Sequence, residues 1–235
     1  MIVLLAGMPR SGSTFSFNVA RELLLKRGSL YQEPHHDVLN VVCRSGRTDH
    51  VLIKCHNLDE PSLALARAGA MRIIITVRRV EDAVASWFEA FPAVPEAVAI
   101  QIMFDWLTMY RQLRSKALVV PYEQIDRRPL QAVWRIARAI CPSARLTEIL
   151  RISRRLNKAA VMARADALAV NDPNVFDGGF SYYDSATFFH RRHVSRLQSR
   201  TAEQRLSEEQ LAMIRERLGD AIEAAGLGRA YNQSF

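Results

Sequence analysis

The sequence predicts an α/β fold of three layers, in which a central, mostly parallel sheet of about five strands carries helices on both faces. Short apolar runs rich in β-branched residues alternate with segments of helical spacing, and a glycine-containing loop joins the first run to the first helix. The 235 residues are 49% hydrophobic, which is enough to fill one core. We therefore expect a single domain over residues 1–235.

The expected strands are apolar segments at residues 1–6, 30–32, 51–55, 71–77 and 117–120. Helical spacing is found in segments 15–26, 61–68, 81–89 and 95–113, from residue 122 onward, and in the arginine-rich segment 130–168. Residues 171–189 contain Pro173, Gly178 and Gly179 and show no period, which predicts a loop. Ser207 and Gln210 form an S-x-x-Q capping box, which predicts the start of the last helix.

The charge balance favours an anionic partner. Lys and Arg number 32 against 24 Asp and Glu, a net charge of +8, which suits a nucleotide, nucleic acid, acidic glycan or membrane surface without choosing among them. Three cysteines without a C-x-x-C pair indicate neither a disulfide framework nor a zinc site. No apolar run approaches the roughly 20 residues that cross a bilayer, so we expect a cytoplasmic protein without stable membrane insertion.

The loop after the first strand, residues 7–14, matches the nucleotide-binding pattern G-x-x-x-x-G-K-[ST] except that Ser13 replaces the lysine. Backbone N–H groups at a helix N-terminus still form a cradle for an anion, and Arg10 brings a cation into the loop. The pattern therefore predicts a P-loop-like fold that holds a short phosphate group rather than a magnesium triphosphate. A tight turn without a ligand is the alternative.

Residues 9–15 (P-R-S-G-S-T-F) resemble the 5′-phosphosulfate loop of the sulfotransferases, P-[KR]-[ST]-G-[ST]-[ST]-[WFL]. These enzymes use 3′-phosphoadenosine 5′-phosphosulfate (PAPS) as the sulfuryl donor. Arg78 and Ser86, which follow a predicted strand, are similar to that family's 3′-phosphate element and have the same eight-residue gap. Residues 52–56 (L-I-K-C-H) resemble its strand-end K-T-H, with Cys55 in place of threonine.

Two later segments resemble the same family more loosely. Residues 188–193 (F-F-H-R-R-H) are similar to F-x-R-K-G, with Arg191 and Arg192 at matching positions and a histidine in place of the glycine. Tyr122 opens Y-E-Q-I, which resembles the family's Y-E-D-L, whose tyrosine lies near adenine. The resemblance is thin over residues 130–187, where we expect the acceptor to be recognised.

The resemblance implies a role for each matched residue. Donor binding is expected from Arg10, Ser11, Gly12, Ser13, Thr14, Phe15, Arg78, Ser86, Tyr122, Arg191 and Arg192. Lys54 and Arg10 would stabilise the sulfuryl and leaving phosphate oxygens, and His56 would be the general base. Glu33 is an alternative base, because some sulfotransferases use a glutamate near that place.

Taken together, the resemblance implies metal-free transfer of a sulfuryl group from PAPS to a hydroxyl or amine of a glycan or small metabolite. Two alternatives stay open. A P-loop kinase should have a lysine at position 13 and a strand ending in aspartate to hold Mg²⁺, and both are missing. A nucleic-acid- or anion-binding protein would suit the charge, but helices over 135–164 have no aromatic beyond Trp134 and no binding signature, so we expect no nucleic-acid partner.

Overall fold

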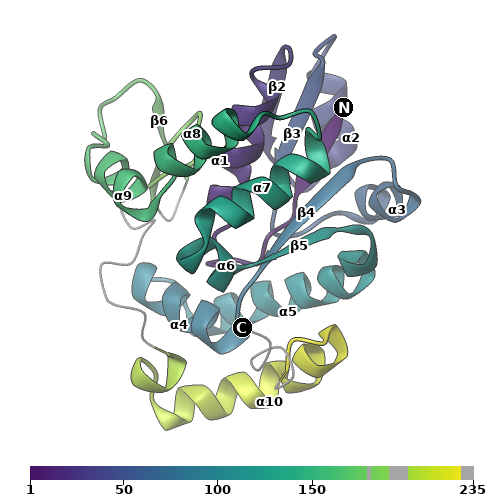
Figure 1. Ribbon diagram of the computed structural model, residues 1–235. Coiled ribbons are helices and arrows are strands. Elements are labelled where there is room, and N and C mark those ends of the chain that lie inside the picture. Colours follow the sequence, from purple (N-terminus) through teal and green to yellow (C-terminus); the bar gives the residue numbers. More distant parts are fainter. Residues whose placement is uncertain (179–180, 191–200, 229–235) are drawn as a thin grey trace.

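Five parallel strands form the central sheet of the computed structural model, which describes residues 1–178, 181–190 and 201–228 (Figure 1). They are β1 (Ile2–Leu5), β2 (Leu30–Pro34), β3 (His50–Lys54), β4 (Arg72–Val77) and β5 (Leu118–Pro121). Their order across the sheet is β2-β3-β1-β4-β5, and each neighbouring pair is parallel. The predicted strands and the α/β fold are confirmed, with small shifts of the strand ends.

Helices cover both faces of this sheet and make the two outer layers (Figure 1). One face carries α1 (Ser13–Leu24), α7 (Pro129–Ile140), α8 (Leu146–Arg155) and α9 (Lys158–Asp166). The other face carries α2 (Val38–Arg44), α3 (Glu60–Ala68), α4 (Val80–Ala90), α5 (Glu96–Leu113) and α10 (Glu208–Ala225). The shorter helical elements are η1 (Arg114–Lys116), α6 (Tyr122–Arg127) and η2 (Ala202–Gln204).

The central strand β1 is apolar throughout because both faces of the sheet are buried around it. Val3 and Leu5 belong to the core cluster on one face and Leu4 to the cluster on the other, and each is at most 1% exposed. Successive side chains of a strand point to opposite faces, so a strand between two helical layers has no polar side. This explains why uninterrupted apolar runs, rather than alternating ones, mark the strands in the sequence.

The register of the strands brings three strand ends to one edge of the sheet. Leu5 of β1 is level with Lys54 of β3 and with Ile74 of β4. The chain places β3 on one side of β1 and β4 on the other. In open α/β sheets, ligands bind beyond the carboxyl ends of the strands, at the point where the strand order reverses. The segments that follow β1, β3 and β4 therefore meet where a ligand site is expected.

Residues 171–189 are not the simple loop that the sequence predicts. They contain an antiparallel pair of short strands, β6 (Val175–Asp177) and β7 (Tyr182–Asp184). The rings of Phe176 and Tyr183 stack across this pair at a centroid distance of 5.7 Å. A three-residue strand is too short to show a period, and its stability comes from the pairing itself.

The helix α2 is also absent from the sequence prediction. Asp37 caps it by accepting a hydrogen bond of 2.9 Å from the backbone N–H of Asn40. The capping box before α10 is confirmed, since Ser207 Oγ accepts from the N–H of Gln210 and Gln210 Oε1 accepts from the N–H of Ser207, both at 3.1 Å. Over the described residues, none of the helices is both long and apolar enough to cross a bilayer.

Candidate active site

A cavity of about 530 Å³ opens at the carboxyl edge of the sheet. It gathers predicted site residues from the β1–α1 loop, the end of β3, the β4–α4 segment and α6: Arg10, Gly12, Ser13, Thr14, Phe15, Lys54, His56, Arg78, Ser86 and Tyr122. These residues are scattered over nearly half of the sequence. The crossovers of the parallel sheet bring them together.

The loop between β1 and α1 is held against β4 by a buried serine. Ser11 Oγ lies 2.6 Å from the carbonyl oxygen of Met8 and 2.6 Å from Thr76 Oγ1. Ser11 is fully buried and does not line the cavity, so its hydroxyl supports the loop instead of facing a ligand. Gly12 has a φ of 83°, a left-handed conformation that favours glycine, and α1 begins immediately after it. The first N–H groups of α1 have no intrahelical partner and form an anion cradle at the cavity wall.

Gly7 is required at the start of this loop for a different reason. A Cβ at this position would lie 2.6 Å from the Cβ of Ser13 and closer still to Thr76 Oγ1. Any larger residue would push the loop away from α1 and β4. The two glycines of the motif are therefore needed for different reasons. At Gly7 the loop passes close to Ser13 and Thr76, and at Gly12 the backbone is left-handed.

Lys54 and His56 lie at the end of β3, and both face the cavity. His56 Nδ1 is 2.6 Å from the carbonyl oxygen of Gly7, and His56 Nε2 is 3.4 Å from Lys54 Nζ. A carbonyl oxygen only accepts, so Nδ1 carries the proton and Nε2 carries the lone pair. The side chain of Cys55, between them, turns to the core on the other side of the strand, where burial raises its pKa to about 12.

The electrostatics of this pair suit a base beside a cation. Burial lowers the pKa of His56 to about 3, the charge of Lys54 adds to the lowering, and the Gly7 carbonyl acts against it. His56 is therefore neutral at physiological pH. Burial also lowers the pKa of Lys54 to about 8. A bound anion would favour the protonated lysine and restore its charge.

Two arginines, Arg10 and Arg78, lie next to each other beside Ser86. Arg10 Nε donates to Ser86 Oγ at 3.2 Å, and Arg78 Nη1 donates to the carbonyl oxygen of Arg10 at 3.4 Å. The guanidinium of Arg78 stacks on the ring of Tyr122, 4.2 Å from its centroid. Burial lowers the pKa of Arg10 to about 10, and the charges of Arg78 and Arg205 add to the lowering. Burial and the two neighbouring positive charges therefore favour an anion beside Arg10.

Glu33, the alternative base, is not brought into the cavity. It lies on the edge strand β2, which β3 separates from β1. One carboxylate oxygen pairs with Arg44 at 2.7 Å, and the other accepts from the hydroxyl of Tyr31 at 2.9 Å. The predicted Arg191 and Arg192 lie outside the described residues.

A largely aromatic and apolar part of the cavity wall was not predicted. It is formed by Trp87, Phe91, Ile102, Tyr183, Phe188 and His190. These residues come from α4, the segment after it, α5, β7 and the residues that follow β7. Trp87 and Phe188 stand beside recognised motifs, but no sequence spacing links the members of this wall. Within the described ranges, no group of three or more His, Cys, Asp or Glu side chains is arranged to hold a metal ion.

Comparison with known proteins identifies the fold. No family model matches the chain, and no curated protein matches its sequence. Among solved structures, the mouse sulfotransferase SULT7A1 in complex with PAP has a TM-score of 0.68 at 15% identity and covers 99% of this chain and 87% of its own. PAP is adenosine 3′,5′-bisphosphate, the product that PAPS leaves when it loses its sulfuryl group.

Retinol dehydratase is similar in two further complexes. With androsterone and the inactive cofactor PAP it has a TM-score of 0.61 at 12% identity and covers 94% of this chain and 80% of its own. With retinol and PAP the TM-score is 0.59 at 13% identity, with coverage of 94% and 81%. The chain therefore has the sulfotransferase fold along nearly its whole length, as the sequence motifs led us to expect.

Proposed function

We propose that the protein is a PAPS-dependent sulfotransferase that transfers the sulfuryl group to a hydroxyl or amine. The observation that carries the proposal is one cavity with two sets of anion-binding groups that come from different strand ends. The first set is the β1–α1 loop with Lys54, and the second is Arg78 with Ser86. A donor with a phosphosulfate at one end and a 3′-phosphate at the other needs two such sets.

We assign the binding roles from these positions. The first-turn N–H groups of α1 and the hydroxyls of Ser13 and Thr14 would hold the 5′-phosphate. Arg78 and Ser86 would hold the 3′-phosphate, with Arg191 and Arg192 as further candidates from the sequence. Phe15 and Tyr122 offer aromatic surface for the adenine.

The chemistry is an in-line displacement at sulfur. The acceptor oxygen or nitrogen forms a bond to sulfur while the bond from sulfur to the bridging phosphate oxygen breaks, and that oxygen leaves with the electron pair as part of PAP. The acceptor proton moves to Nε2 of His56, which already carries the lone pair. Lys54 and Arg10 would stabilise the charge on the leaving phosphate and the sulfuryl oxygens.

The acceptor would be a small molecule with an apolar or aromatic body. The cavity lining also carries Trp87, Phe91, Ile102 and Phe188, which suit a ring system better than a sugar. Retinol dehydratase is named as a complex with androsterone or retinol, both of which have such bodies. A glycan acceptor is the second candidate and is tested in the same experiment.

Incubation of the purified protein with sulfur-labelled PAPS and a panel of phenols, sterols, aliphatic alcohols and oligosaccharides tests this function. We expect a labelled product with at least one apolar alcohol or phenol, PAP in equal amount, and no loss of transfer in EDTA. Labelling of oligosaccharides alone would contradict the acceptor class. Loss of transfer in EDTA would contradict a metal-free reaction, and phosphate transfer from Mg-ATP without PAPS turnover would favour the kinase.

A further inference from the structure

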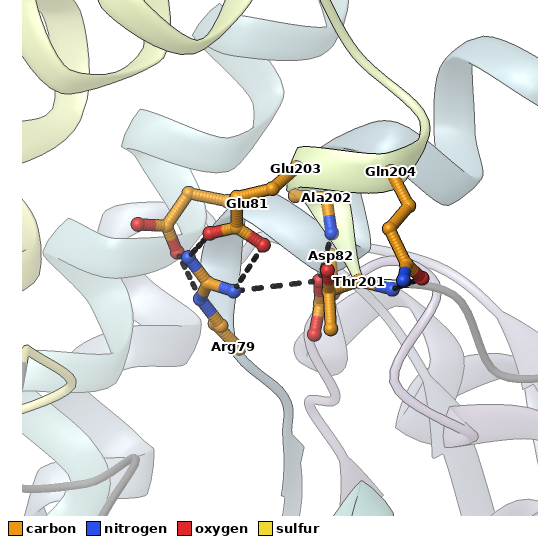
Figure 2. Close-up of polar contacts among 7 residues, drawn as sticks. All are labelled: Arg79, Glu81, Asp82, Thr201, Ala202, Glu203 and Gln204. Carbon is orange, nitrogen blue, oxygen red and sulfur yellow. Dashed lines mark hydrogen bonds and ion pairs between the residues drawn. The ribbon is translucent and has the colours of Figure 1, made fainter.

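The segment 201–206 is docked on α4 by a set of charged contacts (Figure 2). Ala202 is fully buried, and its N–H donates to Asp82 Oδ1 at 2.6 Å. The guanidinium of Arg79 pairs with both oxygens of Glu203, with Nη1 donating to Oε2 at 2.9 Å, and lies 3.4 Å from Glu81. Figure 2 shows Arg79 in contact with both glutamates. These contacts fix the backbone immediately before Arg205.

Arg205 is clamped to the same helix and faces the cavity. Its Nε donates to Glu89 Oε1 at 2.7 Å, and its Nη2 pairs with Glu89 Oε2. The side chain of Arg205 is only 6% exposed, and it lines the cavity. The clamp uses Nε and Nη2, so the hydrogens on Nη1 take no part in it.

The position of Arg205 can be fixed relative to the proposed 3′-phosphate residues. Glu89 follows Ser86 by three residues on α4, and residues three apart share one side of a helix. Arg10 donates to Ser86, and Arg10 is close enough to Arg205 for the two charges to repel each other. Arg205 and Arg10 therefore lie on the Ser86 side of the cavity, where Arg78 donates to the Arg10 carbonyl.

This arrangement gathers three guanidinium groups in one part of the cavity lining. They belong to Arg10, Arg78 and Arg205, and Arg205 has Glu89 as its partner. Buried guanidinium groups are costly to hold together without an anion. A phosphate dianion accepts several charge-assisted hydrogen bonds and suits arginine better than lysine.

We propose that Arg205 is a further donor-binding residue that contacts the 3′-phosphate together with Arg78 and Ser86, and that Glu89 and the docked 201–204 segment position it. This inference rests on the proposed function. It adds a phosphate ligand from a part of the chain that matches no sulfotransferase motif in the sequence analysis. In this proposal the Arg79–Glu203 pair has a positioning role, because it helps to hold a binding residue in place.

Calorimetric titration with two ligands tests the contact directly. PAP carries a 3′-phosphate and adenosine 5′-monophosphate (AMP) does not, so only PAP binding depends on a 3′-phosphate ligand. In Arg205→Gln we expect the Kd for PAP to rise about 10- to 100-fold, the usual cost of one charged hydrogen-bond partner. The Kd for AMP should change less than about twofold. Arg215→Gln, on the exposed side of α10, is the matched control and should change neither value.

Two further variants distinguish loss of the Arg205 contact from the effect of leaving the Glu89 carboxylate unpaired. Arg205→Gln leaves the Glu89 carboxylate without its clamp partner, and this charge could itself repel the phosphate. In the double variant Arg205→Gln/Glu89→Gln that repulsion is gone, so PAP should still bind weakly if Arg205 is a ligand. Arg205→Lys keeps a cation and should recover part of the PAP affinity.

Several outcomes would overturn the inference. Unchanged PAP binding in Arg205→Gln excludes the contact, and recovery of full affinity in the double variant assigns the loss to Glu89. Equal losses for PAP and AMP, or a large drop in melting temperature that Arg205→Lys shares, assign a structural role. Failure of the wild-type protein to bind PAP at all would instead defeat the proposed function, and this inference with it.

Discussion

His56 is held in a single tautomer by its neighbours, and this decides what it can do. The hydrogen bond from Nδ1 to the Gly7 carbonyl leaves Nε2 as the atom that accepts a proton. The low pKa of about 3 keeps the ring neutral but makes it a weak base in the free protein. Binding of an anionic donor would raise this pKa, so the base gains strength when the donor is present.

Replacement of this residue should therefore affect turnover more than donor binding. In His56→Gln we expect kcat to fall by about 100-fold or more, the usual contribution of a general base. The Kd for PAP should stay close to the wild-type value, because the phosphates are held by other residues. Steady-state rates and PAP titrations measure the two effects. Near-normal turnover would exclude His56 as the base.

The lowered pKa of Lys54 predicts how kcat/KM changes at alkaline pH. Burial lowers its pKa from 10.5 to about 8, so its charge in the free protein is lost as the pH rises through about 8. Since the charged form is the one that stabilises the donor's anionic groups, kcat/KM should fall above that pH. In Lys54→Arg this fall should disappear, because arginine stays charged. A wild-type profile that stays flat up to about pH 10, the range of an ordinary lysine, would exclude this role.

The docked segment that carries Glu203 should add a small, pH-dependent contribution to stability. Arg79 lowers the pKa of Glu203 from 4.5 to about 2, so the pair stabilises the folded state at neutral pH and the effect is lost as the pH falls from about 4.5 toward 2. Glu203 is 44% exposed, which limits the effect to about 1 kcal/mol or less.

Urea unfolding of Glu203→Gln and the wild-type protein at pH 7 and pH 3 measures this contribution. We expect the variant to be less stable at pH 7 and the difference to shrink at pH 3. The N–H of Ala202, which donates to Asp82, should exchange faster in the variant because the segment is held less firmly. A difference that stays constant between the two pH values would show that the ion pair is not its cause.

The elements that the sequence predicts well are those with local signals. A buried strand such as β4 is a continuous apolar run, and the capping box at Ser207 marks the start of α10. β6 and β7 escaped prediction because each is three residues long and depends on its partner. The α2 helix has only an aspartate cap and seven residues, which is too little for a clear period.

The same distinction applies to the candidate site, where some residues have local sequence signals and others do not. Its proposed phosphate-binding residues follow from short motifs at strand ends, because parallel strands bring their carboxyl ends to one edge. Its apolar wall and Arg205 come from segments that are distant in sequence and meet only through tertiary packing. No local pattern marks such residues, so this part of the cavity lining could not be predicted from the sequence.

The fold and the site together lead to one expectation for the protein as a whole, which is that it binds PAP through both of its phosphates. Thermal melting with added PAP measures this binding most directly. At about 100 times its Kd, PAP should stabilise the native state by about 2.7 kcal/mol and raise the melting temperature by about 5–10 °C. Arg78→Ala should lose most of that shift at the same PAP concentration. A melting temperature that responds to Mg-ATP but not to PAP would contradict the account.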